Sequence, residues 1–542
     1  MLIRILKTSL GILLLAVIHS PPTLSANKVD VNAVAAAICY EATLPNDSSV
    51  GRPLPLAGHW NTGEFGNGFS PDYQLKMIES GHYLLPWFHL PLPNQAPMKF
   101  EYYRDALQKA AQLKLPISFI STQWERTLTD APRYFYRAAK ENPNVVDERG
   151  NVLKMVSPFG PLGAWYSAGK SWTDRDLIEK LQRLYPKPPL VLFISNNEHK
   201  KLAWPELEKS SRYHAAYPEG LDQEKQRQLV GDAWIKRYRT IQQGMRDGMQ
   251  SNTWKEKAIF IGYDAFGSRA FGRWPEWIDY SLNIPDRFEP WPLAWDGASL
   301  SYYVYHWSTG TDFTVMSPQI ESMNWIFMQA EALKLNSKFW FEMSTWDGYI
   351  PDKPNDKRKY YAALGQQYNP KRYEGYVQFG MWLLRPRVVR EFRDHFSVLS
   401  KDEAYFLSVV NAVDRVYSHP ILKKFWRKGR LLINEKHKHP YQVNIPMAYQ
   451  DVYRWFLLDT NLDPKRPWVL NTQIPVFSLA LVLNEEPDRE WLIYAHAPLG
   501  DQHGVKIVVP HCTTIETDVT SQGAYFHVIE KNSVIHIVSI DI

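Results

Sequence analysis

The sequence predicts an α/β protein with two parts, a (β/α)8 barrel (TIM barrel) and a small C-terminal antiparallel β-sandwich. Segments of consecutive apolar residues recur along most of the chain, and helical patterns separate several of them. A parallel strand that is covered on both faces is apolar throughout instead of alternating. Eight such strands interleaved with helices are typical of a barrel.

The eight predicted strands lie at 53–62, 83–91, 115–125, 188–198, 257–267, 298–307, 337–348 and 373–384. The clearest helical patterns between them span 102–114 and 221–249. Another helix is predicted after Ser317 and Pro318, because serine is a common N-cap and proline a common first residue of a helix.

The last part of the chain follows a different pattern. From about residue 467, short apolar runs are separated by turn residues, and no helical period intervenes. This pattern indicates an antiparallel sheet structure. We therefore assign 27–465 to the barrel with a connecting segment and 466–542 to a C-terminal β-sandwich domain.

Residues 1–26 are predicted to be a secretory signal peptide. Arg4 and Lys7 precede an apolar run, and the small residues Ser25 and Ala26 mark the cleavage site. No later run of about 18 apolar residues follows, so we expect no membrane anchor after cleavage. The predicted location is secreted or periplasmic.

Composition excludes some classes of protein and leaves others open. The chain has 542 residues, 21 of them Trp, and this excess fits either a Trp-rich core or platforms that stack on sugars or bases. The net charge of +5 suits an anionic substrate without requiring one. Only two cysteines occur, Cys39 and Cys512, which excludes a disulfide framework but allows one bridge or two free thiols. We find no phosphate-binding glycine loop and no basic recognition helix, so no nucleic-acid partner is expected.

Two carboxylates are predicted at the active end of the barrel. Glu198 ends strand four and Glu342 lies near the end of strand seven, both within apolar runs. In such barrels the C-terminal ends of the strands form the active site. A facing pair of carboxyl groups is the arrangement that glycoside cleavage requires, one as proton donor and one as nucleophile. A structural salt bridge is the alternative for each, and Glu125 is a rival acid.

Aromatic and polar residues are predicted at most of the other strand ends. Aromatic faces stack on pyranose rings, and neighbouring polar groups select among hydroxyl patterns. For each residue, core packing is the alternative. These candidate substrate-binding residues are His59, Trp60, Trp87, His89, Trp124, Tyr263, His306, Trp307 and Trp346.

Asn197 and Glu198 after strand four, with Glu342 after strand seven, resemble the motifs of the retaining glycoside hydrolases of clan A. The resemblance implies that Glu198 is the general acid/base, Glu342 the nucleophile and Asn197 a donor to the sugar 2-hydroxyl. It also implies that Trp382 lies under the bound sugar. Many members carry an Arg near the end of strand two, and this sequence has none there. No metal and no cofactor are expected.

The expected partner is a polysaccharide or oligosaccharide. The overall organisation is similar to bacterial enzymes that act on red-algal galactans such as agar, porphyran and carrageenan, and sulfate esters would favour nearby Arg269, Arg273 and His199. Neutral β-glucan, mannan or a host-type glycan remain alternatives. Three other classes also stay open: an inactive carbohydrate-binding barrel, a metal-dependent hydrolase and a polysaccharide lyase.

Overall fold

The fold was analysed in a computed structural model of the chain. The structure describes residues 54–61, 68–95, 99–129, 142–196, 209–218, 223–263, 291–303, 329, 332–346, 369–393, 397–434, 456–460, 476–484, 488–498 and 500–541. No helix among these residues combines the length and apolar character needed to cross a bilayer.

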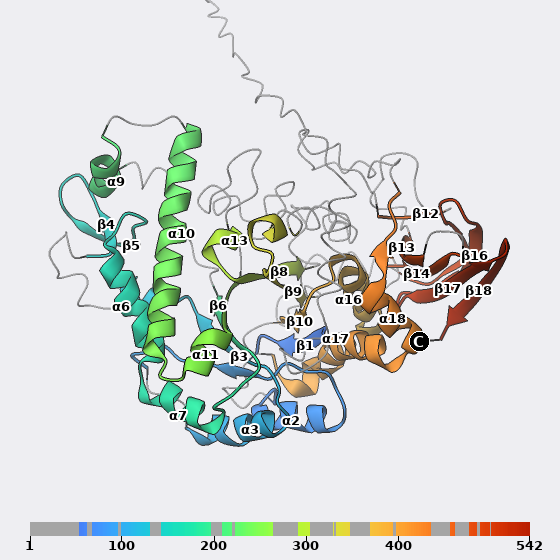
Figure 1. The fold of residues 1–542 in the computed structure, drawn as a ribbon, viewed down its shortest axis with the longest axis horizontal. Helices are drawn as coiled ribbons and strands as arrows, with labels where there is room; N and C mark the ends of the chain where they lie inside the picture. Colours follow the sequence, from blue (N-terminus) through green and yellow to red (C-terminus); the bar gives the residue numbers. More distant parts are fainter. Residues whose placement is uncertain are drawn as a thin grey trace, which may run out of the picture.

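The predicted barrel is confirmed as a parallel, nearly closed eight-stranded sheet with surrounding helices (Figure 1). Its hydrogen-bonded order is β1-β10-β9-β8-β7-β6-β3-β2, and a single parallel bridge, Ala57 to Leu84, brings the two ends together. The strands are β1 (Leu56–His59), β2 (Trp87–His89), β3 (Ile117–Thr122), β6 (Val191–Asn196), β7 (Ala258–Tyr263), β8 (Gly297–Tyr303), β9 (Trp340–Trp346) and β10 (Val388–Glu391).

The helices follow the strands as expected for a barrel, and the patterns at 102–114 and 221–249 correspond to α3 and α10. The helix predicted after Ser317 lies outside the described residues. The helices are α2 (Pro71–Glu79), α3 (Glu101–Gln112), α4 (Arg126–Thr129), α6 (Leu162–Thr173), α7 (Asp176–Leu184), α9 (Ser211–Ala216), α10 (Gln223–Gly248), α11 (Asn252–Lys257), α13 (Trp291–Ala294), α16 (Pro370–Leu384), α17 (Leu399–Ser418) and α18 (Pro420–Lys428). A hairpin of β4 (Asn144–Val146) and β5 (Val152–Val156) lies in the long segment between β3 and β6.

The predicted eighth strand was wrong, because 373–384 forms most of helix α16 and β10 is the actual eighth strand. Asn369 caps the helix by accepting a hydrogen bond from the Arg372 amide, and Pro370 occupies the first turn. Almost every residue from Arg372 to Leu384 is buried. A helix that is covered on all sides carries no polar stripe, so its sequence resembles that of a buried strand.

Helix α16 is buried because it lies between the barrel and the C-terminal sheet (Figure 1). A Cβ atom on Gly380 would lie 2.8 Å from both the Met343 sulfur of β9 and the Tyr302 ring of β8. On the other side, a Cβ on Gly375 would lie 2.2 Å from the Ser521 carbonyl oxygen. The Trp382 indole donates a 2.6 Å hydrogen bond to the Tyr525 hydroxyl in the C-terminal sheet. The two glycines therefore allow α16 to pack closely against the barrel on one side and against the C-terminal sheet on the other.

The C-terminal part consists of two antiparallel sheets, as predicted. One has the order β11-β13-β14-β17-β18 and the other β12-β15-β16, with an apolar core between them. β16 was not predicted, and β11 and β12 come from residues before 466. The strands are β11 (Arg430–Leu431), β12 (Asp459–Thr460), β13 (Phe477–Asn484), β14 (Glu490–His496), β15 (Gln502–Val508), β16 (Thr514–Val519), β17 (Ala524–Lys531) and β18 (Val534–Ile540).

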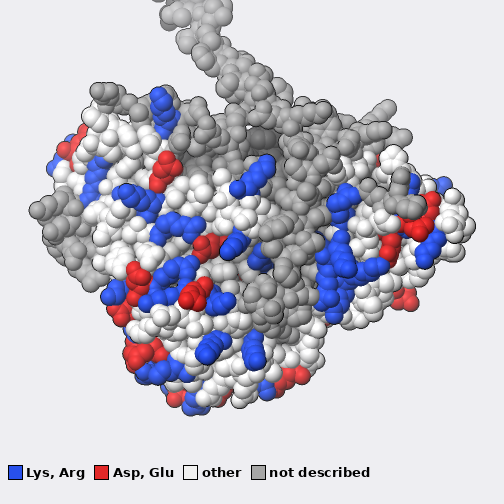
Figure 2. Space-filling view, in the orientation of Figure 1, with Lys and Arg blue, Asp and Glu red and all other residues white. Residues whose placement is uncertain are grey.

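Charged side chains of both signs are intermixed over much of the visible surface (Figure 2). One short helix carries only positive charge among its charged residues: α18 exposes Lys424, Arg427 and Lys428. Lys424 is neutralised by Glu490 of β14 at 2.7 Å. The described surface on this face therefore carries charges of both signs, and the exposed residues of α18 form a local basic area.

The shared burial of α16 predicts that Gly375→Ala lowers the free energy of unfolding by about 1–3 kcal/mol, because the added methyl group has no space beside Ser521. Gly163→Ala in α6 is the matched control, since nothing lies within 4 Å of its Cβ position. That variant should be neutral or more stable by up to about 1 kcal/mol. Urea unfolding, followed by circular dichroism, measures the stability of both variants and the parent. A Gly375→Ala midpoint equal to that of the parent would contradict the close packing.

Candidate active site

The alternation of side chains along β9 separates the barrel interior from its outer layer of helices. Thr345 bonds the Tyr373 hydroxyl of α16 at 2.7 Å, and Met343 lies beside Gly380 of the same helix, so both face outward. Glu342, Ser344 and Trp346 lie on the opposite face of the strand and therefore point into the barrel. The predicted nucleophile is thus an interior residue.

Inside the barrel, Glu342 forms an ion pair with Arg390 of β10. Nε of Arg390 lies 2.5 Å from Oε2 of Glu342, and Nη2 lies 3.1 Å from Oε1. The Trp340 indole donates a third hydrogen bond to Oε1 at 3.1 Å. Both charged side chains have no exposed surface. A bidentate guanidinium fixes the carboxylate in position and stabilises its negative charge.

Gly58 of β1 makes room for this arginine. A Cβ at that position would lie 3.1 Å from Nη1 of Arg390. Nη1 is itself buried and has no hydrogen-bond partner among the described residues. Ser299, the register neighbour of Glu342 on β8, is also buried, and its hydroxyl likewise bonds nothing in the described part of the chain. Two polar groups near the ion pair thus retain unused hydrogen-bonding capacity.

An aromatic cluster lies between the ion pair and the C-terminal end of the barrel. It consists of Trp60, Tyr263, Trp346 and Phe392. The ring centroids of Trp60 and Tyr263 are 4.8 Å apart, and those of Trp346 and Phe392 are 5.6 Å apart. The Trp60 indole donates a 2.7 Å hydrogen bond to Ser344, the interior residue next above Glu342. The predicted residues Trp60, Tyr263 and Trp346 therefore lie together near the mouth of the barrel.

Glu342 lies deeper than the sequence predicted. β9 continues to Trp346, so Glu342 is four residues from the end of the strand, or roughly 13 Å along it. The apolar run WFEMSTW did not reveal where the strand would end. The carboxylate consequently lies below the aromatic cluster and not level with it.

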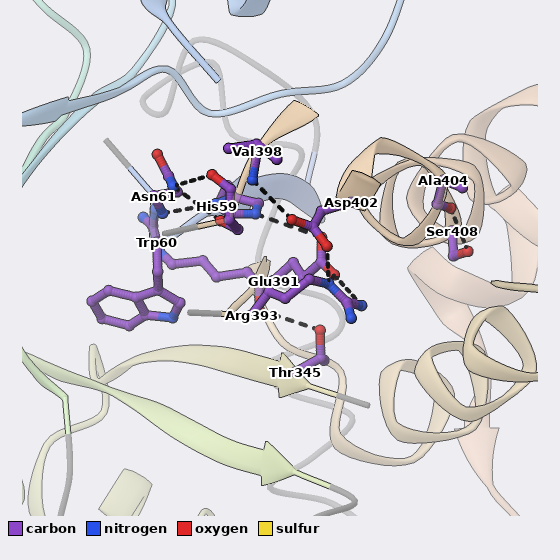
Figure 3. A network of polar contacts seen from close by, with 12 residues as sticks. His59, Trp60, Asn61, Thr345, Glu391, Arg393, Val398, Asp402, Ala404 and Ser408 are labelled. Carbon is purple, nitrogen blue, oxygen red and sulfur yellow. Dashed lines mark hydrogen bonds and ion pairs between the residues drawn. The ribbon is translucent and has the colours of Figure 1, made fainter. Parts of the chain in front are cut away.

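A second polar network lies outside the barrel, between β1, β10 and helix α17 (Figure 3). Glu391 accepts a 3.0 Å hydrogen bond from Arg393, and Arg393 lies 3.6 Å from Asp402 of α17. His59 lies 3.6 Å from Glu391 and accepts a 2.7 Å hydrogen bond from the Asn61 amide. In Figure 3 the Trp60 indole points away from these groups. Adjacent residues along β1 and β10 thus point to opposite sides of the sheet, one into the barrel and the next towards α17.

Burial, together with the nearby positive charges of Arg393 and Arg390, lowers the pKa of His59 from 6.5 to about 3. The ring is stacked on Phe69, with centroids 4.3 Å apart, and meets Phe406 of α17 edge-on. His59 is therefore a neutral core residue at physiological pH. His59 was predicted to contact substrate, and the structure places it facing α17 instead of the barrel interior.

Three predicted tryptophans also belong to the core and have no exposed surface. Trp87 donates to the Asn61 carbonyl oxygen, and its ring packs against Phe406. Trp124 lies under α6 and α10, where its ring meets Trp295 at 5.1 Å. Trp382 lies on α16 and not at a strand end. These residues were predicted to contact sugar, and the structure places them in the core, because strand-end position alone does not determine the face on which a side chain lies.

The remaining predicted residues divide into two groups. His89 ends β2 and is partly exposed, and Asn196 ends β6 on the interior side, since the preceding Ser195 faces Trp124. The predicted acid/base lies beyond this point. The residues Asn197, Glu198, His199, Arg269, Arg273, His306 and Trp307 all lie outside the described residues.

Glu125, the rival acid, is held away from the barrel interior. Its Oε1 accepts a 3.0 Å hydrogen bond from the Tyr238 hydroxyl of α10, on the outside of the barrel. In the described part of the chain, no group of three or more His, Cys, Asp or Glu side chains is arranged to hold a metal ion.

Sequence reasoning missed Arg390, which lies in a segment interpreted as a connection after the last strand. The short run VVRE resembles a strand only once its pairing with β1 and β9 is known. The sequence has no arginine at the end of strand two, and the structure places Arg390 of strand eight against the Glu342 carboxylate. Two charged residues directly after two valines were the only available signal.

Comparisons with known proteins reveal only distant likeness. No family model and no curated protein matches the sequence. Among solved structures, the chain is similar to alpha-L-fucosidase isoenzyme 2 from Paenibacillus thiaminolyticus, with a TM-score of 0.36 and 10% identity over 70% of this chain and 51% of that chain. It is also similar to GH26A from a Muricauda species (TM-score 0.29, 12% identity, 73% and 96% covered). A third is beta-glucuronidase 2 from Bacteroides uniformis, with a TM-score of 0.29 and 8% identity over 90% of this chain and 45% of that chain. The chain spans about half the length of the fucosidase, and likeness at this level transfers no activity.

The buried ion pair predicts a specific pattern of stability. Arg390→Met should lower the free energy of unfolding by about 3–5 kcal/mol, because it leaves the Glu342 carboxylate buried and unpaired. Adding Glu342→Gln should restore most of the loss. Lys424→Met, which breaks an exposed ion pair with Glu490, is the control and should cost about 1 kcal/mol or less. Urea unfolding of five proteins measures the coupling: the parent, the single variants Arg390→Met and Glu342→Gln, their double variant, and Lys424→Met. Additive losses in the double variant would contradict the pairing.

The lowered pKa of His59 predicts a loss of stability on the acid side. Since the folded value of about 3 lies below the ordinary 6.5, the unfolded chain binds the proton first as the pH falls. One such histidine lowers the free energy of unfolding by about 1.4 kcal/mol for each pH unit below 6.5. His59→Gln should therefore flatten the decline in unfolding free energy between about pH 6.5 and about pH 5.

His503 provides the control for this measurement. It is exposed on β15, and its hydrogen bond with Asp518 raises its pKa, the opposite direction. His503→Gln should not flatten the decline. A His59→Gln protein with the same pH dependence as the parent would show that His59 is not held neutral.

Proposed function

We propose that the protein is a secreted glycoside hydrolase that cleaves a polysaccharide with retention of configuration. Glu342 is the proposed nucleophile and Glu198 the proposed general acid/base. The observation that carries the proposal is the Glu342–Arg390 pair: a carboxylate inside a (β/α)8 barrel, held by a guanidinium and followed towards the mouth by an aromatic cluster. The signal-peptide prediction supports the extracellular location.

In the proposed reaction, Glu198 gives its proton to the glycosidic oxygen while a carboxylate oxygen of Glu342 forms a bond to the anomeric carbon. The bond between that carbon and the leaving oxygen breaks. Glu198 then removes a proton from water, which attacks the same carbon and releases Glu342 as a carboxylate. Arg390 would hold Glu342 in a single orientation during both steps, and this positioning limits the reorganisation that the reaction requires.

The sugar must reach a carboxylate that has no exposed surface. We propose that the ring enters between Trp60, Tyr263 and Trp346, whose faces would stack on it and exclude water. Nη1 of Arg390 and the Ser299 hydroxyl, which bond nothing in the described part of the chain, would then donate to sugar oxygens. The unused donors close to the carboxylate support a polar ligand at this depth.

We further propose a red-algal galactan, such as agar, porphyran or carrageenan, as the substrate class. The support is limited to the mildly basic balance of the chain and exposed cations such as those of α18, which suit sulfate esters. A strong preference for neutral β-glucan or mannan in the screen below would remove this part of the proposal and leave the hydrolase intact.

An inactive carbohydrate-binding barrel is the second candidate. The observation that favours it is the complete burial of Glu342 with both oxygens already bonded, which is also the arrangement of a purely structural ion pair. Such a protein would bind a polysaccharide without releasing new reducing ends.

The decisive experiment is a polysaccharide screen with three proteins, read as new reducing ends. Glu342→Gln should lose at least about a thousandfold in turnover, because an amide is a poor nucleophile, while circular dichroism and polysaccharide binding stay unchanged. Glu125→Gln is the matched control, a second buried carboxylate near a strand end that lies outside the barrel, and it should retain activity.

A further variant separates a nucleophile from a structural charge. Glu342→Gly leaves space beside Arg390, and added azide should restore cleavage of an aryl glycoside by forming the bond that the carboxylate normally forms. Activity in Glu342→Gln equal to that of the parent would refute the assignment. Binding without turnover in the parent protein would favour the inactive barrel.

A further inference from the structure

Among the described residues, the outermost strand of the C-terminal sheet, β18, has no partner on its free edge and little cover on either face. β18 pairs only with β17 in the sheet order, and it lies on the side of the sheet away from the barrel (Figure 1). Val534 and Val538 are 54% and 52% exposed on one face, and Ile535 and Ile537 are 36% and 42% exposed on the other. The strand contains no Lys, Arg, Asp, Glu or Pro. Proteins usually protect such an edge with charge, proline or a covering element.

The free edge also presents a regular set of backbone groups. The Glu530 amide donates to Arg489 at 2.9 Å, so its peptide group faces away from β18. Ile535, the register partner of Glu530, is consequently in a non-hydrogen-bonded pair, and its N–H and C=O point to the free edge. Alternation places the N–H and C=O of Ile537 there as well. The strand is therefore prepared for one more antiparallel neighbour.

The sequence of this strand indicates which neighbour fits. Residues 533–539 read SVIHIVS, which is the same in both directions around His536. In an antiparallel pair with a two-fold axis at His536, Val534 would face Val538 and Ile535 would face Ile537 of the other copy. A two-fold interface requires that one surface be complementary to itself, and a palindromic strand meets this requirement residue by residue.

We propose that β18 pairs with β18 of a second copy of this chain, so that the two five-stranded sheets form one continuous sheet across a two-fold axis. Each Ile535–Ile537 pair would exchange two backbone hydrogen bonds. Val–Val and Ile–Ile contacts would cover apolar surface on both faces of the strand. The register is fixed within each copy by the tight turn at Asn532 and Ser533, whose φ angles are 49° and 63°.

A register-specific cross-link tests the proposal in the full chain, with Cys39 and Cys512 replaced by serine. His536→Cys would place two thiols in a non-hydrogen-bonded pair with Cα atoms about 4.5 Å apart, within disulfide reach. Val538→Cys is the matched control. It has similar exposure, but its two copies would lie four residues apart, roughly 13 Å, beyond the reach of a disulfide.

Mild oxidation should convert the His536→Cys protein to a covalent dimer and leave the Val538→Cys protein monomeric. Sedimentation velocity of the parent chain should reveal a concentration-dependent dimer, and Ile537→Lys should remove it, because a lysine on the edge blocks strand addition. Cross-linking at both positions, or at neither, would overturn the proposal. So would a parent chain that stays monomeric at every concentration, or a dimer that Ile537→Lys leaves unchanged.

Discussion

The burial of helix α16 from two sides is the constraint on which the rest of the structure depends. Gly380 lies against the barrel strands and Gly375 against the C-terminal sheet, so one helix completes both cores. Its last turn ends at Arg385, whose left-handed conformation redirects the chain into β10 only three residues later. The placement of Arg390 therefore follows from the placement of α16. The C-terminal sheets thus help to position the barrel's charged centre without contributing to it.

Side-chain alternation on β1 and β10 then separates two charged groups that are neighbours in sequence. Arg390 points inward to Glu342, whereas Glu391 points outward to His59 and Arg393. Each group is neutralised within its own environment, so neither requires solvent. A shift of one residue in the register of β10 would exchange the two groups and leave Glu342 facing a carboxylate instead of its guanidinium. The ion pairs therefore specify the register as well as balancing charge.

Seven of the eight barrel strands could be predicted from the sequence, because strands that are buried on both faces form continuous apolar runs. The eighth could not, since α16 is buried on every side and mostly apolar, like a buried strand, and β10 has only four residues. Strand-end position correctly identified Trp60, Tyr263 and Trp346 as neighbours near the mouth. It failed for His59, Trp87 and Trp124, because a strand end brings residues of both faces to the same level and only the register determines which face is inside. Arg390 was missed because its four-residue strand was not recognised.

Stability alone does not account for the Glu342–Arg390 pair. Replacing a buried ion pair with apolar side chains of similar size is often neutral or stabilising, since removing two charges from water costs several kcal/mol per ion. Such a pair can specify a unique register, as it does here, and it can also serve a ligand site. In a water-excluded interior, the field of a fixed charge acts on a bound ligand far more strongly than it does in solvent. Under the proposed hydrolase function, the depth of Glu342 and the aromatic cluster beyond it would act together: the rings would exclude water, and the carboxylate would act on the sugar in a low-dielectric site.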